Sequence, residues 1–141
     1  MTGILRTVYR FWAAILFLAV LAQVGAAGYG AFNADHLSDK SNALTHRQFD
    51  HGFGLHTALG YLIFLAGLLL FLVALGARLG RRGVLLALGV PLLVFLAIVL
   101  ALVGHNTPAV GVLHPVDAFL VVGLTGYLAH QAWTGRGHTA P

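Results

Sequence analysis

The chain has 141 residues, of which 59% are apolar and 9% charged, with a mean hydropathy of +0.88 and a formal net charge of +4. Soluble domains carry roughly a quarter charged residues, so this composition excludes a cytosolic globular domain and a disordered chain. The absence of cysteine excludes a disulfide framework and a thiolate metal site. What remains is an integral membrane protein, whose scattered basic residues indicate membrane topology rather than nucleic-acid binding.

Four apolar runs are long enough to cross a bilayer, at about residues 11–30, 53–77, 84–103 and 112–133. Each holds about 20 residues or more, which as a helix spans a hydrocarbon core of ~30 Å. In lipid the backbone must satisfy its own hydrogen bonds, so each run is predicted to be a helix. The polar stretch 32–52 is predicted to be an outer loop in which Thr45 caps a brief surface helix. The sequence therefore predicts a single all-α domain over residues 1–141, an integral membrane antiparallel four-helix bundle.

The basic residues predict the orientation of this bundle. Six of the eight fall at one end of it: Arg6, Arg10, Arg78, Arg81, Arg82 and Arg136. The positive-inside rule then places both termini on the cytoplasmic side of a bacterial cytoplasmic membrane, with residues 32–52 outside. The first run also has features of a signal peptide, but it is longer than an apolar region of about 7–15 residues, so a retained helix is predicted.

Histidine is the abundant chemical group, with eight residues in an apolar chain. Six have ordinary interpretations as loop, helix-end, interface or tail residues: His36, His46, His51, His105, His130 and His138. The other two, His56 and His114, lie near the outer ends of the second and fourth runs. Both runs cross the membrane from outside to inside, so the two imidazoles are expected at similar depth on diagonal helices, facing each other across the bundle axis.

The neighbours of these two histidines suit a flat cofactor between the helices. Gly60 and Ala118 each follow a histidine by four residues, so they share its helix face and leave room for a bulky ring. Phe53 and Phe119 are predicted as aromatic walls, and Arg47 in the outer loop is predicted to meet acidic groups of the cofactor, together with Lys40, His46 and His51.

Two histidines fit haem better than other metal centres. The iron of a b-type haem takes two axial imidazole nitrogens while the porphyrin fills its other four positions. A structural zinc ion takes four ligands from the protein, which this pair does not provide. The prediction is a haem b bound by His56 and His114. Asp117, three residues after His114, is expected either to cap its helix or to hydrogen-bond a ring N–H, with capping favoured.

Two stretches resemble a known family: GFGLHTALGYLIFLAGLLL, and after a basic turn ALVGHNTPAVGVLHPVDAFLVV. They resemble one four-helix half of a haem A synthase over roughly residues 50–133, with His56 and His114 at the histidine positions of the second and fourth helices. The resemblance implies the cofactor-holding half. The catalytic half has a His-Arg pair, a nearby carboxylate and often loop cysteines, whereas this chain reads His56-Thr57, has Asp50 as its nearest preceding carboxylate and has no cysteine. The LHP turn also resembles small bacterial four-helix membrane proteins of unknown function.

Four hypotheses about function follow from these patterns. The first is a bis-histidine haem protein for electron transfer or haem handling, with a redox partner or quinone. The second is a non-haem accessory or structural subunit of a membrane complex. The third is a small enzyme acting on a quinone or another lipid, with His56 or His114 as proton carrier. The fourth is an outer metal site of His46, Asp50 and His51. A homodimer that mimics the two fused halves is a further expectation.

Overall fold

The fold was determined from a computed structural model that describes residues 2–41 and 45–135. The described chain forms four long helices, α1 (Thr2–Ser41), α2 (His46–Gly76), α3 (Gly80–Asn106) and α5 (Leu113–Thr134), and one short turn of helix, α4 (Pro108–Gly111). All four long helices are long and apolar enough to cross a membrane, counting α4 with α5. The predicted all-α four-helix bundle is confirmed, and its composition is that of a multi-pass membrane protein.

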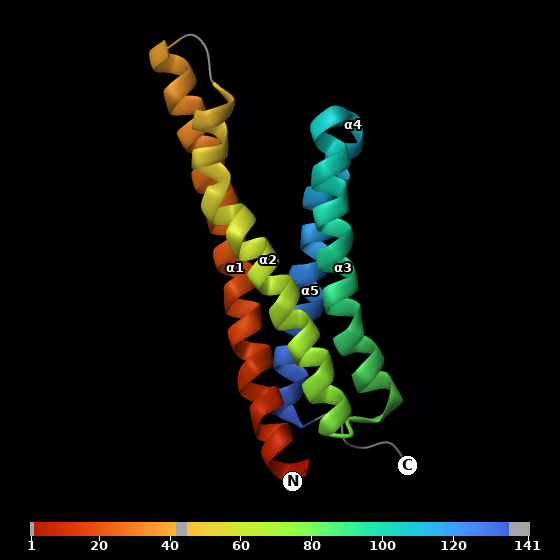
Figure 1. Ribbon diagram of the computed structural model, residues 1–141. Coiled ribbons are helices and arrows are strands. Elements are labelled where there is room, and N and C mark those ends of the chain that lie inside the picture. Colours follow the sequence, from red (N-terminus) through yellow and green to blue (C-terminus); the bar gives the residue numbers. More distant parts are fainter. Residues whose placement is uncertain (1, 42–44, 136–141) are drawn as a thin grey trace.

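The helices are arranged as a closed ring in the order α1, α2, α3, α5 (Figure 1). Each packs against its two neighbours in this order, and within the described ranges α1 makes no close backbone contact with α3, nor α2 with α5. The predicted diagonal relation between the second and fourth membrane helices is therefore confirmed. The start of α1 and the end of α5 lie at the same end of the bundle, as the antiparallel topology requires.

Residues 32–41 and 46–52 of the polar stretch are helical, so the prediction of a loop was wrong for them, whereas the predicted cap at Thr45 is confirmed. α1 continues to Ser41, and α2 already begins at His46. Thr45 is the N-cap of α2: its hydroxyl accepts from the Gln48 amide at 3.3 Å, and the Gln48 side-chain oxygen accepts from the Thr45 amide at 3.0 Å. Polarity marks where the chain leaves the lipid, whereas a helix continues until proline, glycine or a cap ends it.

The α2–α3 turn at the other end is tight. Arg78 and Gly80 both have positive φ, of 52° and 75°, which is costly for arginine and free for glycine. We call this end, with its arginines, the arginine-rich end; the opposite end, which carries α4, we call the histidine end.

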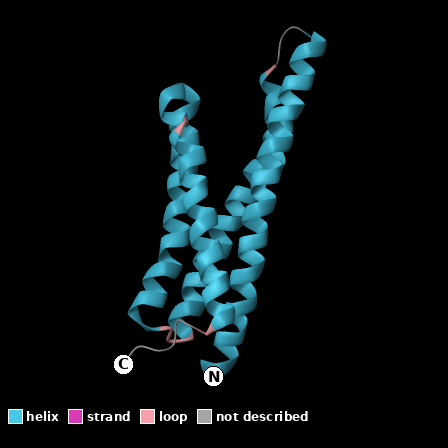
Figure 2. Ribbon diagram, turned by 180° about the vertical axis from the view of Figure 1, so that it is seen from behind, coloured by secondary structure: helices cyan, strands magenta, loops and turns pink. Residues whose placement is uncertain are grey.

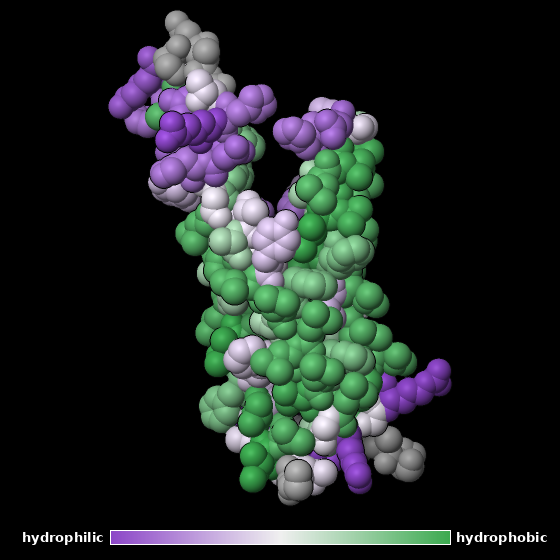
Figure 3. Space-filling model, viewed as in Figure 1, coloured by the Kyte–Doolittle hydropathy of each residue, from purple (hydrophilic) through white to green (hydrophobic). Residues whose placement is uncertain are grey.

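The apolar core lies toward the arginine-rich end of the bundle. Leu16, Leu70, Ala74, Ala87 and Leu128 come from all four long helices, and each is at most 1% exposed. All buried residues of α3 fall between Ala87 and Val94. Beyond that point the α1–α2 and α3–α5 pairs diverge, as Figure 2 shows from behind. The outward faces carry many exposed large apolar side chains, which form the green belt of Figure 3.

Candidate functional site

A cleft opens between the two helix pairs at the histidine end. Its volume is about 390 Å³, within the range of about 300–1,000 Å³ that is usual for small-molecule sites. The notch between the two arms is visible in Figure 3. Its lining is largely aliphatic and comes from all four long helices, including Val20, Ile63, Val94, Ile98 and Val121. The last residue of α3 that is buried in the bundle is Val94. The cleft lies beyond it, where buried side chains of α3 no longer fill the bundle axis.

His56 reaches this cleft from α2 with one ring nitrogen already committed. Its Nδ1 lies 3.2 Å from the backbone oxygen of Gln23 on α1. A carbonyl oxygen can only accept a hydrogen bond, so Nδ1 carries the proton. In the neutral imidazole, Nε2 is then the nitrogen with a free lone pair. A second hydrogen bond joins the same two residues: the Gln23 side-chain Nε2 donates to the His56 backbone oxygen at 2.8 Å.

His114, on the diagonally opposite helix α5, also has its Nδ1 close to a backbone oxygen. Its Nδ1 lies 2.8 Å from the backbone oxygen of Ala97 on α3. That nitrogen must again be the donor, which leaves Nε2 of His114 as the lone-pair nitrogen. Each histidine is thus fixed by the backbone of a helix next to its own, as metal-ligating histidines usually are.

The two imidazoles meet across the bundle axis. Their ring centroids are 6.1 Å apart, and the ring planes are inclined by 76°. Two imidazole nitrogens that share a metal each lie about 2 Å from it, which places the ring centres about 6 Å apart. The distance between the rings of His56 and His114 is therefore compatible with two ligands of one metal ion.

Asp117 lies in the first turns of α5, close to this pair in sequence, and does neither of the two things expected of it. α5 begins at Leu113 with Val112 as its N-cap, and no side chain caps the helix. Asp117 is thus a full turn inside, too far along to accept from the first amides. The His114 Nδ1 contacts Ala97 instead. Asp117 is 4% exposed, and neither carboxylate oxygen has a hydrogen-bond partner among the described residues.

Of the residues predicted to hold the cofactor, the structure brings four together at the cleft. His56, His114, Gly60 and Ala118 all line it. Arg47 does not: it is exposed in the first turn of α2, nine residues before His56, or about 14 Å along the helix. Arg47 is absent from the lining because residues 46–52 belong to α2 and do not form a loop that folds back. Its contact with the cofactor stays a prediction.

The structure also bears on the predicted aromatic walls and on the predicted outer metal site. The ring of Phe53 lies 6.2 Å from the ring of His56, edge to face, whereas Phe119 is 77% exposed and faces outward. In residues 2–41 and 45–135, no three His or Asp side chains form a group that could hold a metal ion. The hypothesis of an outer site made by His46, Asp50 and His51 is therefore not supported by the described residues.

Sequence reasoning missed three contributors to the cleft. Gln23 was detectable, because it is the one amide side chain in the run 11–30 and polar groups in membrane helices tend to bond across helices. Ala97 contributes through its backbone oxygen, which no sequence pattern marks. His105 lines the cleft mouth together with Asp50, although it was interpreted only as a helix-end residue.

Comparison of the chain with protein-family models, with curated proteins and with solved structures finds no match. The resemblance to a half of haem A synthase thus stays a prediction.

Proposed function

We propose that this chain is a b-type haem protein of the cell membrane, with His56 and His114 as the two axial ligands and with a role in electron transfer or haem handling. One observation carries the proposal. Two imidazoles from helices that do not touch lie 6.1 Å apart beside a cleft, and each has its Nδ1 hydrogen-bonded to a backbone carbonyl. This leaves two lone-pair nitrogens where one metal could take both.

The number of ligands favours haem over a bare metal ion. Zinc sites use three or four protein ligands, and the described residues offer no such group. Haem needs two at most, because the porphyrin supplies the other four. A bound haem would supply a one-electron change of its iron, the chemistry expected when both axial positions are filled.

The chain's own residues would tune and protect such a group. The carbonyls of Gln23 and Ala97 fix the tautomer and raise the basicity of the two ligands. The aliphatic lining keeps water away, and Gly60 and Ala118 leave space beside the histidines. A flat ring with an apolar body suits a cleft of this composition.

Under this proposal the histidine end faces outward and the arginine-rich end faces the cytoplasm. The basis is the positive-inside rule applied to the arginines of the described chain, Arg6, Arg10, Arg78, Arg81 and Arg82. A haem at the outer end would exchange electrons with a partner or a quinone that reaches that side of the membrane.

The decisive experiment is a visible spectrum of the full chain, expressed with ample haem, purified in mild detergent and then reduced with dithionite. We expect about one haem per chain, with a Soret band that sharpens and shifts on reduction. His56→Ala and His114→Ala should each lose the axial ligation and most of the pigment. His130→Ala is the matched control, because His130 is exposed at the end of α5 that is far from the cleft.

Two results would overturn the proposal. One is a folded wild-type protein without a Soret band after expression with excess haem. The other is a pigment that survives both single substitutions unchanged, since ligation would then come from elsewhere.

A further inference from the structure

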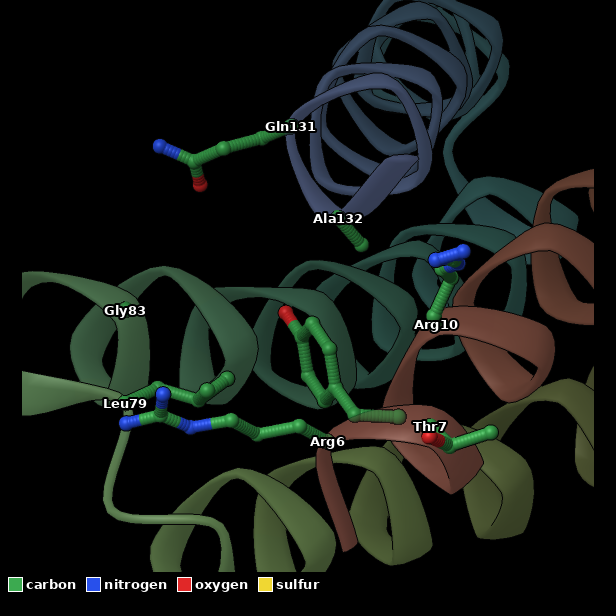
Figure 4. A pocket seen from close by; sticks show the side chains of 8 residues that line it. Arg6, Thr7, Arg10, Leu79, Gly83, Gln131 and Ala132 are labelled. Atoms are coloured by element: carbon green, nitrogen blue, oxygen red, sulfur yellow. The ribbon is translucent and has the colours of Figure 1, made fainter. Parts of the chain in front are cut away.

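A second pocket lies at the arginine-rich end, well away from the histidines. Its volume is about 210 Å³, and it is formed where the start of α1, the start of α3 and the end of α5 meet. Arg6 and Arg10 come from α1, Leu79 and Gly83 from the α2–α3 turn and α3, and Gln131 from α5. Figure 4 shows the Arg6 side chain extending toward Leu79, whereas the Arg10 side chain points in a different direction. The pocket thus holds two guanidinium groups that come from different turns of one helix.

Both arginines contact the protein, although Arg6 is exposed and Arg10 half-buried. The Nε of Arg6 donates to the backbone oxygen of Ala77 at 3.4 Å. The guanidinium carbon of Arg10 lies 4.4 Å from the centre of the Trp133 ring, a cation–π distance. The Nε of Arg10 is enclosed and has no acceptor among the described residues. An enclosed donor without a partner is costly, so this atom calls for an acceptor that residues 2–41 and 45–135 do not provide.

No side-chain carboxylate is available to neutralise these charges. The chain has four acidic residues, Asp35, Asp39, Asp50 and Asp117. Asp117, in the first turns of α5, is 14 residues before Gln131, or about 21 Å along that helix. The other three belong to the far end of α1 and the start of α2. No side-chain carboxylate of the chain therefore lies at the arginine-rich end to neutralise Arg6 and Arg10.

We propose that this pocket binds the phosphate of an anionic phospholipid, with Arg6 and Arg10 as the cationic residues that line it. Guanidinium groups match phosphate oxygens in charge and in their paired donors. Basic pockets between membrane helices on the cytoplasmic side are suited to lipid headgroups. A free phosphate species offers the same chemistry, but this pocket lies at the end of four helices that are long and apolar enough to cross a membrane. A pocket in that position is at the depth of the lipid headgroups, which favours a lipid.

The site does not depend on the haem proposal, because it shares no residue with the cleft. The test is native mass spectrometry and thermal unfolding of the full chain in a neutral detergent. Dioleoyl phosphatidylglycerol is the anionic probe, dioleoyl phosphatidylcholine the zwitterionic one, and inorganic phosphate the soluble one. We expect phosphatidylglycerol to bind and to raise the unfolding midpoint, while phosphatidylcholine with the same chains does neither.

Substitutions locate the site. Arg6→Gln and Arg10→Gln should each weaken phosphatidylglycerol binding about five-fold, and the double variant about 25-fold. Arg81→Gln is the matched control: it removes the same charge at the same end and is exposed like Arg6, but Arg81 does not line this pocket. If Arg10→Gln does not fold, because its contact with Trp133 is lost, the comparison of Arg6→Gln with Arg81→Gln decides alone.

Inorganic phosphate separates the two sources of the ligand. If millimolar phosphate leaves phosphatidylglycerol bound and the midpoint unchanged, the proposed lipid site is supported. If phosphate displaces the lipid and raises the midpoint equally, the pocket is a site for soluble phosphate compounds and the lipid assignment is overturned. Equal binding of both lipids, or an equal loss in Arg81→Gln, would overturn the site itself.

Discussion

At the arginine-rich end the four helices share one apolar core, whereas at the histidine end they separate into two pairs with a cleft between them. The difference lies in the residues on the bundle axis. Ala74 and Ala87 are fully buried in the closed half and let the helices approach. In the open half, the axis positions are taken by the two histidines and by small residues such as Gly60 and Ala118. The same four helices therefore provide a rigid base and an opening above it.

Within each pair, the helices stay close even at the open end. A Cβ on Gly52 of α2 would come within 2.8 Å of the Asn33 side chain of α1. A Cβ on Gly104 of α3 would come within 2.6 Å of the backbone of Gly111 in α4. Glycine is required at position 104, where the neighbour is backbone, whereas at position 52 the end of the Asn33 side chain could move. Separation thus occurs between the pairs and not within them, which keeps the cleft walls firm.

The largest difference in stability is expected between two variants that carry the same substitution, alanine to leucine, one in the closed half and one beside the cleft. Ala74→Leu adds three carbons at a position that is 0% exposed, and overpacking of this kind costs about 3 kcal/mol. Ala118→Leu adds the same atoms beside the cleft and should cost less than about 1 kcal/mol, because there is space to receive them. Unfolding in mixed micelles measures both.

This pair of variants also tests the use of the cleft. Ala118→Leu should retain the fold but lower haem content, since it fills space next to His114. Equal destabilisation by both substitutions would mean that the cleft is closed in the folded protein in solution.

A smaller effect on stability is expected when alanine replaces either of two glycines, one packed against backbone atoms and one with open space around it. Gly104→Ala places a methyl group against backbone atoms that cannot rotate away, and should destabilise the protein by about 1 kcal/mol. Gly123→Ala, exposed within α5 with nothing within 4 Å of the new Cβ, should stabilise it by about 0.5–1 kcal/mol. Thermal midpoints of the two variants should therefore move in opposite directions. A lowered midpoint for both would show that glycine at 123 has a packing role.

The spans, the ring order and the paired histidines could be predicted because they depend on hydrophobicity and helix geometry alone. The extent of α1 could not, because polarity was taken as the end of a helix. Residues 32–41 contain neither proline nor glycine, so no helix breaker ends α1 where its polar part begins. A water-exposed helix and a loop have the same polar composition, and the absence of helix breakers was the better signal.

The hydrogen bonds that orient the histidines were beyond prediction for a different reason. Their acceptors are the backbone oxygens of Gln23 and Ala97, and every residue has such an oxygen. Which carbonyl meets a ring depends on how far each helix is rotated about its axis, a quantity fixed by packing. Asp117 illustrates the same limit, because its position predicted a cap and packing buried it instead.

The smallest effect concerns the side chain of Gln23, which joins α1 to α2 beside the cleft. Its Nε2 donates to the backbone oxygen of His56, but its Oε1 is buried with no acceptor role among the described residues. Interhelical hydrogen bonds in membrane proteins contribute about 0.6 kcal/mol on average. Gln23→Leu removes that bond together with an unsatisfied oxygen, so the two changes partly cancel and the loss of stability should be about 0.5 kcal/mol or less.

Ala22→Leu, one residue away and exposed, is the control. The contact from His56 Nδ1 to the Gln23 backbone does not need the side chain, so ligand orientation and haem content should persist. A loss in Gln23→Leu above about 2 kcal/mol, beyond the largest bonds of this kind, would mean that the amide holds the two arms apart and is part of what keeps the cleft open.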